Sequence, residues 1–82
     1  MMESYHFRMT TTHSTRYREM LQRLRSAREK AGMTQSQVAA KLKQYNTYVC
    51  KCESGERRID FIELERFADL YDKKITWFIP KK

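Results

Sequence analysis

The 82-residue sequence contains only two glycines, one proline and two cysteines. So few turn-forming residues argue against all-β architectures, collagen-like repeats and low-complexity linkers. No apolar run approaches the ~18 residues that cross a bilayer, and the opening residues lack the apolar core of a secretory signal. We therefore expect one small, helical domain in the cytoplasm, with no membrane partner.

The two cysteines, Cys50 and Cys52, stand two residues apart in a predicted helix. Positions i and i+2 of a helix point to different faces, so these thiols cannot bridge each other. No second Cys or His pair at metal-ligand spacing accompanies them, which makes a zinc site or a redox switch the minor alternative. We expect reduced thiols, a buried Cys52, a partly exposed Cys50, and neither metal nor cofactor.

The charge of the chain is unevenly distributed. Its 17 Lys and Arg against 10 Asp and Glu give a formal net charge of +7. Residues 1–58 hold 12 basic and 5 acidic side chains, whereas residues 59–82 hold 5 of each. A basic region beside a neutral one predicts a polyanion partner on one side of the molecule, with nucleic acid first and a membrane surface second.

Hydrophobic periodicity predicts an all-α fold. Residues 1–13 show no sustained period and are interpreted as a flexible tail, which leaves residues 14–82 as one compact domain. Apolar residues at helical spacing then predict five helices joined by short loops. In chain order they cover about 14–31, 34–42, 46–53, 60–71 and 75–79, the last being a short turn or helix ended by Pro80.

Local signals fix the helix ends and a candidate core. Thr34–Gln37 and Asp60–Glu63 are capping boxes, and Ile59 and Leu64 can form a hydrophobic staple across the second. The side chains expected to face inward are Tyr17, Met20, Leu21, Leu24, Ala27, Ala31, Val38, Ala39, Leu42, Val49, Cys52, Leu64, Phe67, Ala68, Tyr71, Trp77 and Phe78. The sequence does not decide whether Tyr48 packs under its helix or stacks on the backbone of a ligand. The arginine-rich first helix is otherwise expected to be a solvated face that adds long-range steering toward a polyanion.

The second and third predicted helices have the spacing of a helix-turn-helix. The helix at about 45–53 is polar at its start and carries groups that can pair with base edges in the major groove of DNA. The candidate base contacts are Gln44, Asn46, Thr47 and Lys51. The candidate phosphate contacts around them are Gln35, Lys41, Lys43, Arg57 and Arg58.

Five segments occur in an order and spacing that is specific when taken together. They are Leu24-Arg25-x-x-Arg28, Gly32-Met33-Thr34-Gln35, Val38-Ala39, the segment 53–58 (ESGERR) and Ile75-Thr76-Trp77-Phe78. Through them residues 21–79 resemble the helix-turn-helix family of lambdoid phage repressors, Cro proteins and bacterial xenobiotic-response-element-type regulators. The resemblance implies a five-helix repressor-like domain that regulates transcription, as a dimer on a near-palindromic operator with half-sites about 34 Å apart.

The resemblance also implies roles for individual residues. Gln35 would contact a phosphate and steady the recognition helix, Asn46 and Thr47 would reach base edges, and Lys51 would reach a base or an inner phosphate. The loop that carries Arg57 would face phosphates through this side chain and its backbone N–H groups.

A structural ion pair is implied between Arg28 and Glu53. Because the pair would be partly buried, breaking it from one side would cost about 3 kcal/mol. The chain departs from the family at two turns, where Lys43 and Asp72 stand in place of glycine. Lys43 must therefore either adopt a positive φ at a cost of about 1 kcal/mol or enter the turn differently.

Two other functions remain open. An antitoxin would bind DNA with the same module and a protein toxin through the tail or the last two helices, whereas an adaptor would bind proteins without affinity for DNA. An enzyme is not expected, because the sequence offers no nucleophile with its base and orienting group, no metal cluster and no phosphate-binding glycine loop.

Overall fold

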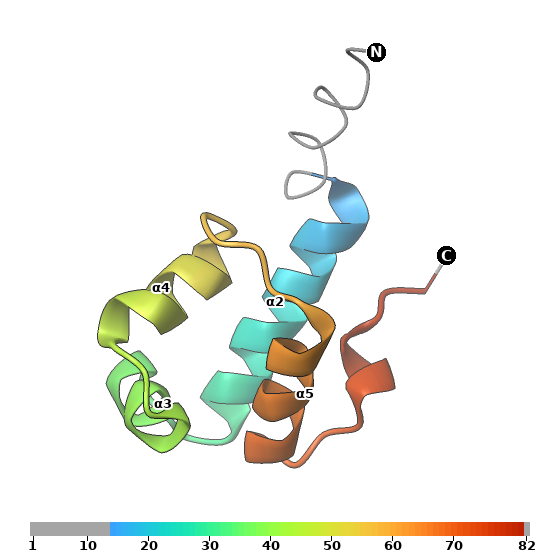
Figure 1. Ribbon diagram of the computed structural model, residues 1–82. Helices are drawn as coiled ribbons and strands as arrows, with labels where there is room; N and C mark the ends of the chain where they lie inside the picture. Colours follow the sequence, from blue (N-terminus) through green and yellow to red (C-terminus); the bar gives the residue numbers. More distant parts are fainter. Residues whose placement is uncertain (1–13, 82) are drawn as a thin grey trace.

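The computed structural model describes residues 14–81, in which helices are joined by short loops. Four α-helices, α2 (Thr15–Lys30), α3 (Gln35–Leu42), α4 (Asn46–Ser54) and α5 (Phe61–Leu70), are followed by one turn of 3₁₀ helix, η1 (Ile75–Phe78) (Figure 1). Within this part of the chain there is no β-strand. The predicted flexible tail, residues 1–13, lies outside the described residues.

The prediction of five helices is wrong, because four α-helices span the described residues and the last segment is only a 3₁₀ turn. Pro80 explains the difference. A residue that precedes proline is driven out of the α region, and Ile79 is extended, with φ −88° and ψ 117°. The last helical segment is therefore limited to the four residues of η1.

Side-chain caps start three of the α-helices, as the sequence predicts for two of them. The Ser14 hydroxyl accepts a hydrogen bond from the Tyr17 N–H at 3.1 Å. Both bonds of each predicted capping box are present, between Thr34 and Gln37 and between Asp60 and Glu63. These caps satisfy backbone N–H groups that the first turn of a helix leaves without partners, so the helix starts are encoded locally.

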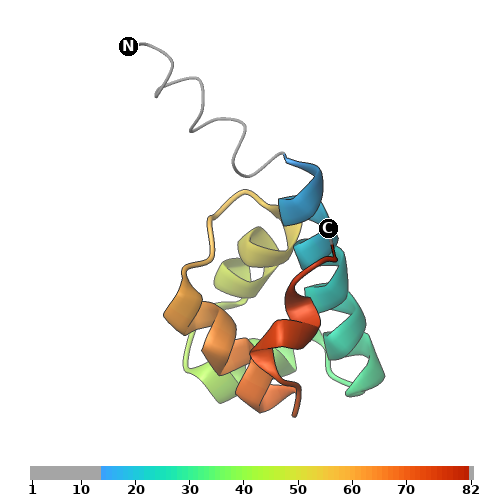
Figure 2. The same cartoon turned by 90° about the vertical axis from the view of Figure 1, so that its right-hand side faces the viewer.

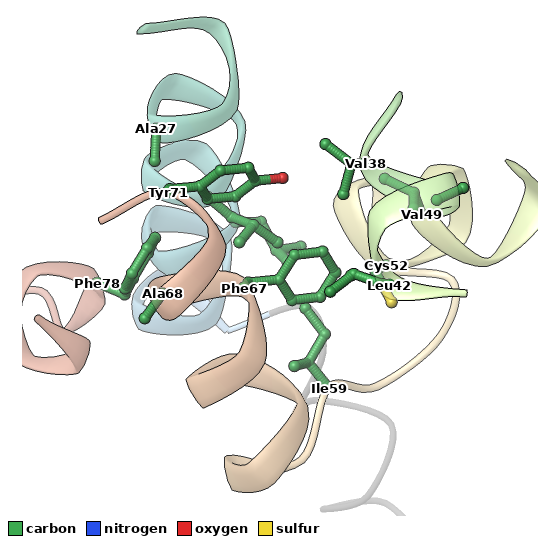
Figure 3. Close-up of a cluster of buried hydrophobic side chains, with 13 residues drawn as sticks. Ala27, Val38, Leu42, Val49, Cys52, Ile59, Phe67, Ala68, Tyr71 and Phe78 are labelled. Carbon is green, nitrogen blue, oxygen red and sulfur yellow. The ribbon is translucent and has the colours of Figure 1, made fainter. Parts of the chain in front are cut away.

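The core lies where α2, α3, α4, α5 and η1 meet. α4 packs on α3 and on α2, while η1 packs on α2 and on α5. Phe67 is fully buried at the centre and points toward Leu42 and Cys52 (Figure 3). The remaining buried apolar residues are Leu21, Leu24, Ala27, Val38, Ala39, Val49, Ile59, Ala68, Tyr71 and Phe78. Ala31, expected inside, is exposed because α2 has already ended there.

Two arginines of α2 hold the C-terminal segment in place. Arg23 Nη1 donates to the Trp77 carbonyl oxygen at 2.9 Å, and Arg16 Nη1 donates to that of Pro80 at 3.2 Å. Figures 1 and 2 agree in placing this segment on the side of α2 away from α4. The expectation of a merely solvated basic face is therefore wrong for these two residues.

The turn between α3 and α4 contains Lys43 in the left-handed conformation, with φ 59° and ψ 46°. Lys43 therefore adopts a positive φ, the first of the two options that the sequence left open. Asp72, after α5, does the same at φ 58°. The carbonyl oxygen of Leu42 accepts a hydrogen bond from Arg66 Nη2 at 2.9 Å, so an arginine of α5 helps to fix the turn.

Replacing Lys43 with glycine should stabilise the domain by about 1 kcal/mol, because glycine adopts this backbone conformation without a Cβ penalty. Urea denaturation of Lys43→Gly against the parent chain measures the change. Lys41→Gly, two residues earlier inside α3, is the matched control and should destabilise by about 1 kcal/mol. Equal destabilisation by both substitutions would contradict the assigned strain.

Candidate nucleic-acid interface

One face of α4 is entirely exposed. Counted from its first residue, the exposed positions are i, i+1, i+4, i+5 and i+8, which lie on one side of a helix. They are occupied by Asn46, Thr47, Cys50, Lys51 and Ser54. On the opposite side Val49 and Cys52 are fully buried in the core. In Figure 1 α4 lies at the edge of the molecule, so this exposed face of α4 is open to a large partner.

The structure brings the four predicted base contacts together. Gln44 in the turn, Asn46 and Thr47 in the first turn of α4, and Lys51 one turn later are all exposed. None of their side chains makes a hydrogen bond or ion pair within residues 14–81, so their donors and acceptors are available to a ligand. This availability is a physical requirement for reading base edges.

Two further exposed side chains on this surface were not among the predicted contacts. Tyr45, the N-cap residue of α4, is 83% exposed and stands between Gln44 and Asn46. Cys50 follows Asn46 by four residues, and this spacing could have placed it on the exposed face of α4. The two thiols are free, Cys50 exposed and Cys52 buried, as the sequence predicts.

The predicted phosphate contacts divide into two groups. Lys41, Lys43 and Arg58 are exposed, and their side chains make no hydrogen bond or ion pair within the described part of the chain. Gln35 and Arg57, in contrast, already have partners in the folded domain. Their contacts with phosphate stay predictions, and each must exchange or share its present partner to make them.

The predicted ion pair between Arg28 and Glu53 is confirmed. Arg28 Nε lies 2.7 Å from Glu53 Oε2, Nη2 donates to Oε1 at 3.2 Å, and the two side chains are only 11% and 5% exposed. Arg28 Nη1 also donates to the Met33 carbonyl oxygen at 2.9 Å. The hydrogen bond to Glu53 raises the pKa of Arg28 although burial opposes it.

Gln35 joins this pair from the first turn of α3. Its Nε2 donates to Glu53 Oε1 at 3.0 Å, so the carboxylate receives hydrogen bonds from α2 and from α3. Because Glu53 belongs to α4, the three side chains fix α4 relative to both preceding helices. We call Arg28, Gln35 and Glu53 the carboxylate clamp.

Arg57 lies at the other side of α4, in the loop before α5. Its guanidinium carbon is 4.9 Å from the centre of the Tyr48 ring, and Nη1 lies 2.9 Å from Glu63 Oε2. Tyr48 in turn stacks on Phe67, with ring centres 6.2 Å apart. Tyr48 therefore packs between the core and Arg57, which decides a placement that the sequence left open.

Two further features of the described residues bear on function. In residues 14–81 no three His, Cys, Asp or Glu side chains are grouped so that they could ligate a metal ion. The helices of this part of the chain are too short or too polar to cross a membrane.

An exposed polar helix held to a preceding helix through a tight turn is the helix-turn-helix arrangement. A family model described as a helix-turn-helix domain matches residues 19–72, which is more than half of the chain. The protein therefore belongs to the helix-turn-helix domain family, and double-stranded DNA is the ligand class that this membership indicates. Neither the curated proteins nor the solved structures gave a match to the chain.

We expect the carboxylate clamp to contribute more to the free energy of unfolding than an exposed ion pair does. Glu53→Gln removes the carboxylate and leaves the buried Arg28 without a counter-charge, which should lower the free energy of unfolding by about 3 kcal/mol. Glu29→Gln, which breaks the exposed 3.8 Å pair with Arg25, is the control and should cost less than about 1 kcal/mol. Similar losses in urea denaturation would contradict this ranking.

Acid should weaken the loop between α4 and α5. Burial raises the pKa of Glu63, but the hydrogen bonds from Arg57 and from the Asp60 N–H outweigh it and hold that pKa below 4.5. The resulting stability is complete above pH 4.5 and is lost as the pH falls through the lowered pKa. Tm measured over this range should fall more for the parent than for Glu63→Gln.

Glu65→Gln is the matched control for this titration. Glu65 is exposed on the same helix and has no ion pair within residues 14–81. Its substitution should leave the acid-induced fall of Tm unchanged. If Glu63→Gln also leaves the fall unchanged, the bonds to Glu63 do not contribute to stability.

Proposed function

We propose that the protein is a sequence-specific DNA-binding regulator of transcription, most simply a repressor, which places α4 in the major groove. The observation that carries this proposal is the exposed face of α4. There Asn46, Thr47 and Lys51, with Gln44 in the preceding turn, have no partners among the described residues, and the carboxylate clamp holds their helix in place.

The chemistry of these four side chains suits base edges. An Asn or Gln amide pairs with adenine through N6 and N7, and a Lys ammonium binds the acceptors of guanine. A threonine offers its hydroxyl to a base and its methyl to thymine. Because Gln44, Asn46 and Thr47 are exposed at the start of α4, the helix would enter the groove with its N-terminal half leading, as in other helix-turn-helix domains.

Phosphate contacts would flank the groove on both sides. Lys41 and Lys43 lie at the end of α3, and Arg58 lies in the loop after α4, so the cations stand before and after the recognition helix. Such contacts fix register and supply most of the affinity without reading sequence. Gln35 and Arg57 would join them by donating hydrogen bonds to a phosphate as well as to the carboxylates of Glu53 and Glu63.

A dimer on a near-palindromic operator, of the lambdoid repressor and Cro type, completes the proposal. Within residues 14–81, exposed apolar side chains outside α4 are available for self-association, namely Phe61, Ile62 and Ile79, which are 64%, 60% and 49% exposed. The segment that carries them is neutral in charge, so two copies could approach there without strong repulsion.

The same apolar side chains favour one second candidate. An antitoxin would bind DNA through α4 and a protein toxin through a surface such as the exposed Phe61 and Ile62 of α5. An adaptor without DNA affinity has no comparable support, because it leaves the unpartnered side chains of α4 unexplained. We propose binding rather than catalysis as the activity, in a reducing cytoplasm where both thiols stay free.

Selection of bound sequences from a random DNA pool tests the proposal directly. A palindromic consensus is expected, and sedimentation of the complex should give two chains per duplex. Asn46→Ala or Thr47→Ala should weaken binding to the selected site by about 1–3 kcal/mol while leaving binding to scrambled DNA unchanged. Arg58→Ala should weaken both equally and reduce the slope of log K against log salt by about 1.

Thr76→Ala, an exposed change on η1, is the control and should alter neither affinity nor slope. Equal losses on both DNAs for Asn46→Ala and Thr47→Ala would contradict the assignment of base reading. No enrichment of any sequence, together with binding that salt does not affect, would contradict DNA binding altogether.

A further inference from the structure

The five arginines of α2 differ in what holds them. Arg16 and Arg23 donate to carbonyl oxygens of the C-terminal segment, and Arg28 belongs to the carboxylate clamp. Arg18 has no ion pair or hydrogen bond from its side chain within residues 14–81, and Arg25 has only a loose pair with Glu29. Three of the arginines therefore stabilise the domain, whereas the guanidinium groups of Arg18 and Arg25 are available to a ligand.

The two remaining arginines share one face of α2 with a glutamine. Arg18, Gln22 and Arg25 occupy positions i, i+4 and i+7, which lie along one side of a helix, and all three are exposed. We call these three residues the α2 stripe. At about 1.5 Å per residue its arginines are about 10 Å apart along the axis, so their guanidinium groups can reach separate phosphates.

The α2 stripe is continuous with the exposed face of α4. One groove, of about 200 Å³, is lined by the whole stripe together with Leu21, Glu53 and Ser54. A neighbouring groove, of about 170 Å³, is lined by Arg25, Gln35, Cys50, Glu53 and Ser54. The two grooves share Arg25, Glu53 and Ser54, so the stripe begins where the exposed face of α4 ends.

The charge of this surface suits a polyanion. Glu53 is the only acidic residue that lines either groove, and its carboxylate is already neutralised by Arg28 at 2.7 Å. The pair between Arg25 and Glu29 has a separation of 3.8 Å between side chains that are 65% and 62% exposed, so it costs little to exchange for a phosphate. The grooves therefore present positive charge and amide donors.

We propose that the α2 stripe binds the phosphodiester backbone of the same DNA duplex, beyond the C-terminal end of α4. Arg18 and Arg25 bind separate phosphates, and Gln22 donates its amide N–H between them. The inference rests on the proposed function and extends its footprint past the helix-turn-helix. Arg18 lies just before the segment that the family model matches, residues 19–72.

The test compares the salt dependence of DNA binding among variants of the full chain. Arg18→Gln/Arg25→Gln should reduce the slope of log K against log salt by about 2, since each phosphate contact contributes about 0.9. Affinity at physiological salt should fall on the order of tenfold, equally on the selected site and on scrambled DNA. Arg18→Lys/Arg25→Lys keeps both charges and should keep the slope.

A charge-matched control separates contact from long-range attraction. Lys74→Gln/Lys81→Gln also removes two positive charges, but from the C-terminal segment, which lies on the side of α2 away from α4 (Figures 1 and 2). This variant should keep the slope of the parent. A melting curve for each variant checks that the domain stays folded.

The outcomes distinguish this inference from the proposed function. Suppose that the parent binds DNA and that Arg18→Gln/Arg25→Gln has the same slope as the parent or as Lys74→Gln/Lys81→Gln. The α2 stripe then does not touch the backbone, whereas the proposed function stands. If the parent binds no DNA, both fail. A slope that is reduced for Arg18→Gln/Arg25→Gln and for no other variant supports the contact.

Discussion

The carboxylate of Glu53 is the constraint on which the rest of the structure depends. It is 5% exposed and receives hydrogen bonds from Arg28 of α2 and Gln35 of α3, while its own backbone belongs to α4. A buried charge tolerates few arrangements, because both of its oxygens need donors in suitable geometry. The angle between α4 and the two preceding helices is therefore set by polar bonds as well as by the apolar core.

A second set of contacts limits the other side of α4. Phe67 of the core supports the Tyr48 ring, Tyr48 supports the guanidinium of Arg57, and Glu63 pairs with that guanidinium while its side chain caps α5. The loop between α4 and α5 is thus connected to the core and to the next helix. A cation held in this way is preorganised, and binding a phosphate there would require little ordering of the side chain.

The local parts of the fold could be predicted from the sequence, whereas of the long-range polar contacts only the Arg28–Glu53 pair could, through the family resemblance. Capping boxes and apolar spacing depend on residues within one or two turns, so Thr34 and Asp60 mark helix starts correctly. The bonds from Arg23 to Trp77 and from Arg66 to Leu42 join residues 54 and 24 positions apart and end on carbonyl oxygens. Every residue has a carbonyl oxygen, so such partners leave no mark in a sequence. For the interface, helical spacing predicted an exposed polar face on α4, but whether Gln35 and Arg57 would be free depended on Glu53 and Glu63, which only the folded structure brings near.

The attachment of the C-terminal segment has an evolutionary consequence. Arg16 and Arg23 bind carbonyl oxygens of this segment, not its side chains. An exposed side chain such as Ile79 can therefore be exchanged without loosening the attachment. The surface on that side of α2 can acquire or lose partners by mutation while the exposed face of α4 keeps its geometry, so the two surfaces can evolve separately in one small domain.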